Sequence, residues 1–480
     1  MKRVILMSVF SLMICLSSFS QEEDGKPVIS GSLSTDNRFL FADDNPWSWN
    51  ENRIDLKIEH KFSTKARFGS DIWFRKFALY NDQDAYYKYP EIREAYMEVY
   101  DFLMPGLDLK AGRQRIKWGC ADKINPVDNV NSYDLEDLWD FGRHMGNEAI
   151  KLKYYKNDWQ FEAVYLPVFT EARLPLGNMT NALMPEFKLP TSYSTILPLS
   201  DTLIIPISLK LQFNELNMVN VMPKINLSEG SSGGFRVANR FGNFDVAMSY
   251  LYARDGLPVA NQAYLSLDSV SLTSGQSYLR SDIELIYPRM HYVGAEVTGT
   301  IGSVGVWAEA VMVKPNKKYY LSTELPDFSS YLSNLVGIPI TLPSLSYPDS
   351  LVLDNKPWFR YVVGCDYTFG NGIYMNFQFA HGFMHERTSD ELNDYFLLRA
   401  EKKIMNEKLR LSLLSGGFAV SDWSNISSNN AFAWTPEIGY KPNDNTEIIL
   451  GTRIIDGVGD GMFAKLKNQD ELFLRLSYSF

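Results

Sequence analysis

The 480-residue sequence is poor in the residues that build metal sites and disulfide frameworks. It has only three cysteines and five histidines, which excludes a cysteine-rich zinc site and a disulfide scaffold. It also lacks a basic surplus, because 47 Lys and Arg face 57 Asp and Glu and give a net charge of −10. Since nucleic-acid binding requires a basic stripe, no nucleic-acid partner is expected.

The first twenty residues form a segment of their own. Met1–Ser20 opens with two basic residues, continues through an apolar run and closes on small residues. This pattern predicts a secretory signal peptide over residues 1–20, which is removed from the mature protein. A lipoprotein signal at Cys15 is the alternative, but Ile14 stands where such a signal needs a small residue.

Long apolar runs are missing from the rest of the chain. Beyond Gln21 no apolar stretch approaches the roughly 18 to 20 residues that a membrane helix needs. The protein is therefore either soluble outside the inner membrane or crosses a membrane without helices. Its hydrophobic residues, which make up 45% of the chain and include 27 Tyr and 29 Phe, must then be arranged in some way other than in membrane helices.

Apolar residues recur at every second position over most of the chain. In the segment 53–62, Ile54, Leu56 and Ile58 alternate with charged residues. Such a two-residue period predicts strands with one apolar and one polar face. The same alternation returns at 244–254, 290–301 and 472–480.

The connections between these strands alternate between very short and long. The short ones contain the Asn, Asp and Gly residues of tight hairpin turns. They lie at 63–65, 156–158, 241–243, 302–303 and 370–372. The long ones are polar and lie at 41–52, 77–91, 118–148, 169–232, 255–288, 314–357, 383–393, 417–430 and 457–470.

Together these patterns predict an all-β fold. We expect a single transmembrane antiparallel β-barrel of about sixteen to eighteen strands, with short periplasmic turns and long extracellular loops. A closed barrel pairs its backbone groups within lipid, and one of this size encloses water for its charged face. The barrel is predicted over residues 21–480. The long extracellular loop 169–232, which includes a hairpin near Ile204–Gln212, is predicted to cap the pore or to contact a partner.

The end of the chain resembles a known signal. Leu474, Leu476, Tyr478 and Phe480 alternate up to the last residue. This ending resembles the C-terminal signal by which the barrel-assembly machinery recognises bacterial outer-membrane proteins, so these residues are expected to direct membrane insertion. With the signal peptide, the resemblance implies the outer membrane of a Gram-negative bacterium and a surrounding of outer-membrane lipids.

A second resemblance lies in Gly112–Gly119, followed by Asp122 and by Asn125–Asp128. The letters GRQRIKWG, then D and NPVD, resemble a motif of a family of porin-like outer-membrane barrels, and the motif covers only residues 112–128. The resemblance implies a barrel over nearly the whole mature chain. Because some relatives lie near lipid-export systems, lipid or glycan export or surface assembly is the alternative to a channel.

The loop 118–148 is the first candidate for a constriction, because the corresponding loop of general porins folds into the lumen. Charges of both signs surround it, and facing charges orient polar solutes in a narrow pore. The alternative is that ion pairs such as Arg113 with Asp122 or Asp128 pin the loop to the wall, and the two roles are compatible. The pore and constriction candidates are Arg113, Arg115, Lys117, Trp118, Asp122, Lys123, Asn125 and Asp128.

The polar faces of the strands place further charges inside the barrel. Neither sign dominates, so strong ion selectivity is not predicted. Cys120 and Cys365 are expected at different depths of the wall and therefore unbonded. The lumen-facing candidates are Arg53, Asp55, Lys57, Glu59, Glu94, Glu98, Lys151 and Lys153.

Enzyme-like patterns are weak. His381, His385 and Glu386 have a spacing that metal ligands use on a helix, but they lie where a strand passes into a loop. The glycine-rich segment 456–461 lacks the ligand pattern of an EF-hand. No catalytic residue, metal or cofactor is therefore expected.

The predicted function is a porin-like outer-membrane channel for passive diffusion of small polar solutes. Diffusion is expected to be passive because the sequence shows no nucleotide-binding loop. The expected partners are small polar solutes, outer-membrane lipids and the barrel-assembly machinery, and a homo-oligomer is left open beside a monomer.

Overall fold

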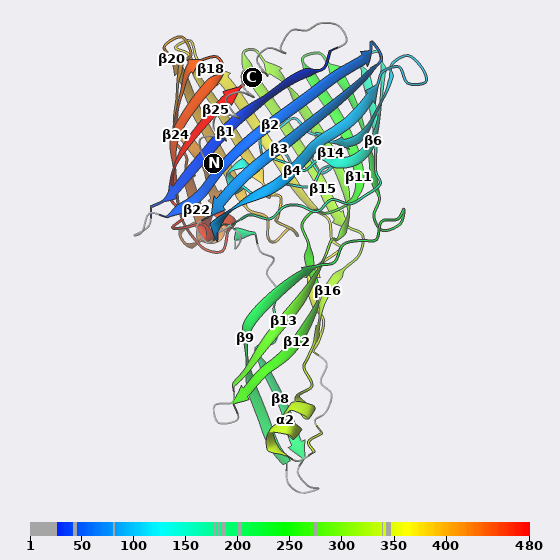
Figure 1. Cartoon of the computed structure of the whole chain (residues 1–480), viewed down its shortest axis with the longest axis vertical. Helices are drawn as coiled ribbons and strands as arrows, with labels where there is room; N and C mark the ends of the chain where they lie inside the picture. Colours follow the sequence, from blue (N-terminus) through cyan, green and yellow to red (C-terminus); the bar gives the residue numbers. More distant parts are fainter. Residues whose placement is uncertain are drawn as a thin grey trace, which may run out of the picture.

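The structure is a computed structural model of the chain. It describes residues 26–41, 46–79, 82–176, 179, 182–183, 188–198, 204–271, 276–337, 339–341 and 347–480. The predicted signal peptide lies outside the described residues. The described residues form two sheets, a large barrel and a smaller sheet that projects from one end of it (Figure 1).

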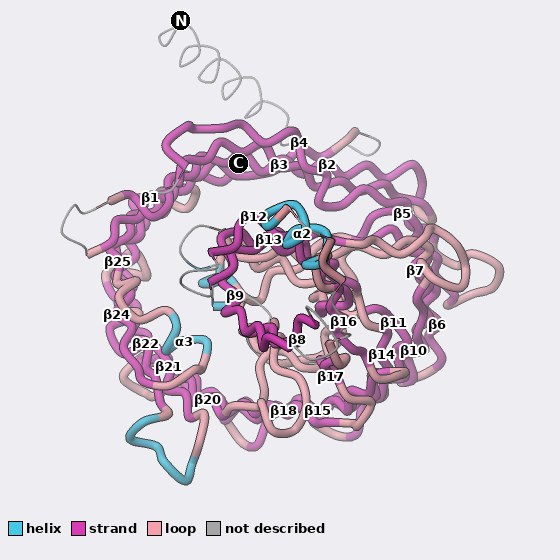
Figure 2. The backbone as a smooth tube through the Cα atoms, turned by 90° about the horizontal axis from the view of Figure 1, so that it is seen from below, coloured by secondary structure: helices cyan, strands magenta, loops and turns pink. Residues whose placement is uncertain are grey.

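Antiparallel strands close into the barrel, as predicted (Figure 2). Its segments are β1 (Val28–Leu40), β2 (Trp47–Ser63), β3 (Ala66–Leu79), β4 (Asp82–Val99), β5 (Leu107–Gln114), β6 (Asn147–Lys156), β7 (Trp159–Leu166), β10 (Ser232–Phe241), β11 (Phe244–Arg254), β14 (Arg289–Ile301), β15 (Val304–Pro315), β18 (Trp358–Thr368), β19 (Ile373–His381), β20 (Asp394–Ile404), β21 (Leu409–Val420), β22 (Asn430–Trp434), β23 (Glu437–Asn443), β24 (Thr446–Val458) and β25 (Glu471–Ser479). β22 and β23 are successive pieces of one wall strand, since each pairs with both β21 and β24. The wall therefore has eighteen strands, and β1 closes it by pairing with β25.

Side chains alternate between the two faces of the wall. On β18, Phe359 and Val363 are 56% and 52% exposed, whereas Arg360 and Val362 are buried. The exposed residues share the outer face and the buried ones face the lumen, as the two-residue period of a strand requires. On this strand the outer face is thus apolar, and the charged Arg360 points inward.

Short turns lie at one end of the barrel and long loops at the other. The turns after β10 and β14 use Gly242 and Gly302, whose φ angles of 61° and 62° lie in the left-handed region that glycine adopts without strain. The start of β1 and the end of β25 lie side by side at the short-turn end, because Ser32 is paired with Ser479.

Two loops are shorter than the sequence predicts. β2 begins at Trp47 and β4 at Asp82, so the wall extends into the predicted loops 41–52 and 77–91. Their polar composition predicts loops, but the described backbone is extended over most of both segments instead.

Three long loops contribute to a second sheet, which we call the extension (Figure 1). In sheet order its strands are β17 (Ser350–Leu353), β16 (Tyr319–Glu324), β12 (Val259–Ser271), β13 (Gln276–Ile286), β9 (Ile204–Asn220) and β8 (Ser192–Pro198). The hairpin expected near Ile204–Gln212 corresponds to β8 and β9, but β9 continues to Asn220 and pairs in parallel with β13. Figure 2 shows the extension within the outline of the barrel ring.

The extension has an apolar core of its own. Leu209, Leu279 and Ile283 are fully buried in it, together with Phe328 of helix α2 (Phe328–Val336). Asp327 caps the start of α2 by accepting a hydrogen bond from Ser330 N (3.1 Å). The extension is therefore a folded unit rather than a set of polar loops.

The remaining helices are short. Helix α3 spans Met462–Lys465, and two 3₁₀ helices span Leu138–Asp140 and Trp423–Ser428. No helix within the described part of the chain is both long and apolar enough to cross a membrane.

Both described cysteines are free, as expected from their placement. Cys120 lies inside the barrel, where its amide contacts Glu309. Cys365 lies on the outer face of β18, two residues beyond Val363. The wall separates the two thiols.

Candidate functional site

The chain between β5 and β6, residues 115–146, turns into the lumen, and we call it the lumen loop. Its first residues are tied to its own turn. The Arg115 guanidinium pairs with both carboxylate oxygens of Asp128, and Ile116 N donates to Asn131 Oδ1 (2.7 Å). The loop therefore has a defined shape before it meets the wall.

The middle of the 112–128 motif forms a tight turn. Gly119 has a φ of +92°, and a Cβ at this position would lie 2.1 Å from Asn125 Oδ1. Asn125 Nδ2 in turn donates to the Trp118 carbonyl oxygen (3.1 Å). Because a side chain does not fit here, glycine is required at residue 119.

One side of the lumen loop is fixed to β7 and β15 by acidic side chains of the wall. Glu309 accepts hydrogen bonds from the backbone amides of Cys120 and Ala121. Trp118 is buried, and its Nε1 donates to Glu162 Oε1 (2.6 Å). Apolar residues of the loop and the wall pack around these contacts.

The other side of the lumen loop is fixed by ion pairs in which the wall is the basic partner and the loop the acidic one. Here the wall strands β1, β3 and β4 supply arginines, and the loop supplies carboxylates. The pairs are Arg38 with Asp137 (2.5 Å), Arg75 with Glu136 (2.5 Å) and Arg93 with Asp134 (2.7 Å). All six residues are buried, so losing one partner leaves an unpaired buried charge at a cost of about 3–5 kcal/mol.

The loop carboxylates keep their charge in acid. Burial raises the pKa of Asp137, but the charge and hydrogen bonds of Arg38 outweigh it and hold this pKa well below its usual range. The pKa of Asp134 is lowered in the same way, because Arg143, Arg93 and Arg173 outweigh burial. These ion pairs therefore persist at mildly acidic pH.

A cavity of about 350 Å³ lies between the lumen loop and the inner wall. Its lining comes from residues 122–143 of the loop and from strands β1, β2, β19–β22, β23, β24 and β25. Cationic and anionic side chains line it from both sides. The groups of most interest below are Asp122, Lys123, Asp140, Arg399, Glu437 and Arg453.

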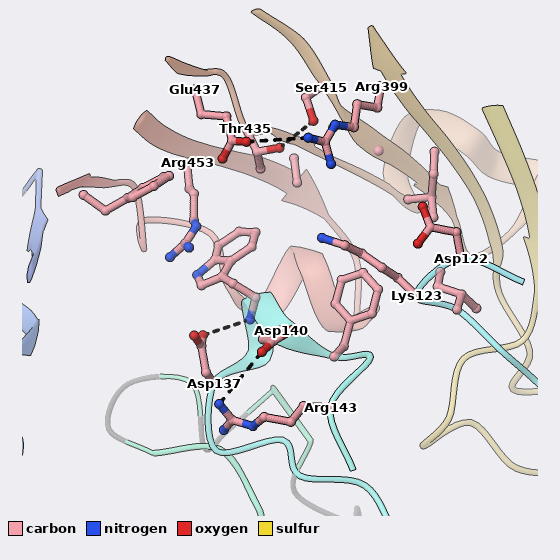
Figure 3. Close-up of a pocket in the computed structure, with 18 of the residues that line it drawn as sticks. Asp122, Lys123, Asp137, Asp140, Arg143, Arg399, Ser415, Thr435, Glu437 and Arg453 are labelled. Carbon is pink, nitrogen blue, oxygen red and sulfur yellow. Dashed lines mark hydrogen bonds and ion pairs between the residues drawn. The ribbon is translucent and has the colours of Figure 1, made fainter. Parts of the chain in front are cut away.

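Lys123 is a loop cation that reaches into this cavity, which Arg143 of the same loop also lines (Figure 3). It is exposed and has a φ of +63°. Arg399 and Glu437, 3.8 Å apart, lie on the wall strands that face it. The loop and the wall thus present charges of opposite sign, Lys123 and Glu437, to the same cavity.

The structure divides the eight pore candidates into groups. Asp122 and Lys123 line the cavity. Arg115, Trp118, Asn125 and Asp128 make the loop's internal and wall contacts described above. Lys117 is exposed but does not line the cavity.

Arg113 corrects the sequence prediction. It continues the face of Leu107 and Leu109, and its ion pair with Glu148 (2.9 Å) lies on the face of β6 that carries Ile150, which is 45% exposed. The apolar residues of β5 take the outer face, so strand alternation carries Arg113 outside as well. It neither lines the pore nor pairs with Asp122 or Asp128.

The lumen-facing candidates all lie on the inner face. The candidates on β2 share a face with Glu51, whose carboxylate pairs with Arg75 (2.7 Å). On β4, the Glu98 carboxylate pairs with Arg67 (2.7 Å). Lys151 alternates with the exposed Ile150. The full set is Arg53, Asp55, Lys57, Glu59, Glu94, Glu98, Lys151 and Lys153.

The C-terminal residues close the barrel. Leu474, Leu476 and Tyr478 are each 37% exposed on the outer face of β25. Phe480 exchanges backbone hydrogen bonds with Gly31 (2.9 and 3.0 Å). Their role in recognition by the barrel-assembly machinery stays a prediction.

The sequence did not single out the groups that fix the loop, namely Arg38, Arg93, Glu162 and Glu309. A signal for Glu309 was present, because it is the only acid in the otherwise apolar strand Val304–Pro315. A buried charge in such a strand needs a partner. The partner itself could not be found by spacing, since Cys120 and Glu309 are far apart in sequence.

The histidines near the end of β19 do not converge. His381 Nδ1 contacts Asp394 (2.7 Å), whereas Glu386 accepts hydrogen bonds from Phe383 N (2.8 Å) and from Asn393. Burial, together with the nearby cations Lys465, Arg387 and Arg360, lowers the pKa of His385 to about 3. Among the residues described, no group of three His, Cys, Asp or Glu side chains is placed to hold a metal.

Comparisons with known proteins are limited to solved structures. No family model matches the chain, and no curated protein matches it. One similar structure is OmpF of Salmonella typhi in complex with daunomycin, at 11% identity, a TM-score of 0.40 and coverage of 95% of this chain and 98% of that one. Another is in-vitro folded OmpT, an outer membrane protein of Vibrio cholerae, at 10% identity, a TM-score of 0.41 and coverage of 96% and 99%. Likeness of this degree transfers no residue role or activity, so the arguments below rest on this chain's own geometry.

Proposed function

We propose that this chain is an outer-membrane channel through which small polar solutes diffuse passively. The observation that carries the proposal is the cavity of about 350 Å³ between the lumen loop and the wall, lined by charges of both signs. Charged groups that face each other across a narrow passage orient polar solutes and exclude apolar ones.

A location in the outer membrane is supported by the two faces of the wall. Apolar residues such as Phe359 and Val363 are exposed on the outside, and lipid would cover them. The closed strand ladder leaves no unpaired edge, which a lipid environment requires. In this orientation the short turns lie in the periplasm, and the extension projects from the cell.

Asp122 and Lys123 of the lumen loop and Arg399 of the wall would contact the solute. Arg399 is 39% exposed at its side chain, so it is partly hydrated beside Glu437. The pinned parts of the loop would keep these groups in place rather than touch the solute. Diffusion down a gradient requires no further chemistry from the chain.

The test is conductance. The full chain, refolded and inserted in a planar bilayer, is expected to give steady ohmic current at constant voltage. A protein that is folded, as shown by its circular dichroism, yet electrically silent contradicts the proposal.

The second candidate is a barrel for lipid or glycan export or for surface assembly. The extension favours it, because a six-stranded sheet with its own core is not needed for diffusion. A silent bilayer together with altered surface lipid or glycan in cells that lack the chain supports this candidate. Association into a homo-oligomer stays a prediction under both.

A further inference from the structure

Residues 221–231, between β9 and β10, form a projecting segment that we call the rim finger. Next to it, the outer-face residues of β11 and β14 change in polarity along the strands. The outer face is apolar at Met248 (68% exposed) and Val293 (44% exposed), then carries Tyr252, and ends on Arg254 and Arg289. A step from apolar to aromatic to charged residues is typical of the boundary between hydrocarbon and headgroups.

The two arginines at this boundary hold the rim finger. Arg254 Nε donates to the Glu229 carbonyl oxygen (2.7 Å). Arg289 donates to the carbonyl oxygens of Glu229 (2.7 Å) and Ser231 (2.9 Å). Because both arginines follow the outward alternation of their strands, the finger lies against the outside of the wall, next to its long-loop end.

The rim finger has a defined internal structure. Asn226 Oδ1 accepts hydrogen bonds from Ser228 N (3.1 Å) and Glu229 N (2.7 Å), and Gly230 N donates to the Asn226 carbonyl oxygen (3.0 Å). Side-chain capping of this kind holds a turn in one conformation. The residues at its tip are therefore presented in a fixed direction.

The tip is apolar and almost fully exposed. Ile225 and Leu227 are 79% and 80% exposed, and Val221 and Met222 beside them are 40% and 47% exposed. Lys224, with 80% of its side chain exposed, adds a cation, and its Nζ lies 4.0 Å from the Glu229 carboxylate. A lysine can extend its ammonium group to the headgroups while the apolar side chains beside it enter the lipid. This combination is therefore suited to the membrane interface.

We propose that the rim finger inserts Ile225 and Leu227 into the lipid layer at the headgroup boundary, where Lys224 meets lipid phosphate. The occupant is lipid because the finger continues the apolar outer face of β11 and β14 on the same side of the wall. The inference rests on the proposed location of the barrel in a membrane. It adds a lipid-anchoring role for a loop outside the wall strands.

The test measures depth in the bilayer. In the full chain with Cys15→Ser, Cys120→Ser and Cys365→Ser, a single cysteine is placed by Leu227→Cys, by Met248→Cys on the wall or by Tyr264→Cys on the extension, and each is labelled with a small fluorophore. Vesicles contain phosphatidylcholine with or without bromine on the acyl chains. The label at residue 227 is expected to lose at least half its emission in brominated vesicles, as at 248, whereas the label at 264 is unchanged.

The outcomes separate the two proposals. Quenching at 248 but not at 227 overturns the rim-finger inference and leaves the barrel's location intact. A blue-shifted but unquenched label at 227 indicates a protein contact and also overturns it. Absence of quenching at 248 overturns the membrane location and the inference together.

The headgroup contact is tested in the same vesicles. Adding phosphatidylglycerol is expected to increase quenching of the label at residue 227, and Lys224→Glu is expected to abolish this dependence. Quenching that ignores the anionic lipid, with Lys224 present, overturns the phosphate contact.

Discussion

The lumen loop and the extension are both long connections between wall strands, yet they are stabilised in different ways. The lumen loop is held by buried arginine–carboxylate pairs to one wall and by acid–amide contacts to the other. The extension is held by apolar side chains, and its ion pairs, such as Arg280 with Asp268, are exposed. A segment inside a charged lumen can be fixed by charge, whereas a segment in open solvent must build its own core.

The largest effect is expected from breaking a lumen ion pair. Arg38→Ala leaves the buried carboxylate of Asp137 without its arginine and removes one of the two arginines that bind Asp36. It is expected to destabilise the barrel by about 3–5 kcal/mol. Urea unfolding of the refolded protein measures the loss. Arg67→Ala is the matched control, because its pair with Glu98 is partly exposed and is worth about 0–1 kcal/mol. Equal losses in the two variants would contradict the role assigned to Arg38.

The extension is expected to be destabilised by a cavity in its apolar core rather than by the loss of an ion pair. Leu279→Ala removes a fully buried side chain from its core and is expected to cost about 2–5 kcal/mol of local stability. Limited proteolysis should then cut the extension while the barrel remains intact. The control is Leu351→Ala, which removes a side chain that is 49% exposed. Joint unfolding of the barrel would show that the two regions are not independent.

The loop between β19 and β20, which carries His385, and the carboxylates of the lumen loop are expected to differ in their response to pH. The pKa of His385 is about 3 in the folded protein, below its ordinary value, so the unfolded state takes up a proton first as the pH falls. Its contribution to stability is complete above about pH 6.5 and is lost progressively toward pH 3, by up to tenfold in the folding equilibrium per pH unit. His385→Gln should reduce this slope in urea unfolding at pH 7 and pH 5, and the part that remains is expected from His144, whose pKa burial also lowers.

The lumen carboxylates should not contribute in that interval. Since their folded pKa values lie below the ordinary range, the stability that they add is present above about pH 4 and is lost only in stronger acid. A slope between pH 7 and pH 5 that survives His385→Gln but disappears with Asp134→Asn would contradict this assignment.

The smallest effect on stability is expected at the cavity itself. Lys123→Glu reverses an exposed charge that lines the passage and should leave the urea midpoint unchanged while raising the cation-to-anion permeability ratio severalfold. Lys117→Glu is the matched control, since Lys117 is exposed in the same loop but does not line the cavity. Equal shifts in the two variants would contradict a specific role for residue 123.

Much of the wall could be predicted because its signals are local. Alternation around Ile54 and Val293, and the glycine turns at Gly242 and Gly302, follow from the two faces of a strand and from the angles of a tight turn. Of the extension, only the hairpin near Ile204–Gln212 was predicted. The strands of the extension, such as β12, alternate Ser with Leu. Because Ser and Leu differ less in polarity than the charged and apolar residues that alternate in the wall, these segments of the long loops were predicted as coil.

The candidate site was predicted only in part. Asp122 and Lys123 line the cavity as expected of pore residues, but Arg113 lies outside because one residue of register exchanges the faces of a strand. Arg38 and Glu309 could not be assigned, since their partners are distant in sequence and nothing local identifies them.

The chain's alternation and turn residues determine that it forms strands, roughly how many, and which side chains share a face, because these properties depend on neighbours within a few positions. Tertiary folding determines which carboxylates meet which arginines, that three loops join into the extension, and where the cavity remains. Those outcomes depend on the closure of an eighteen-strand ring, which brings residues as distant as Asp36 and Arg475 into contact.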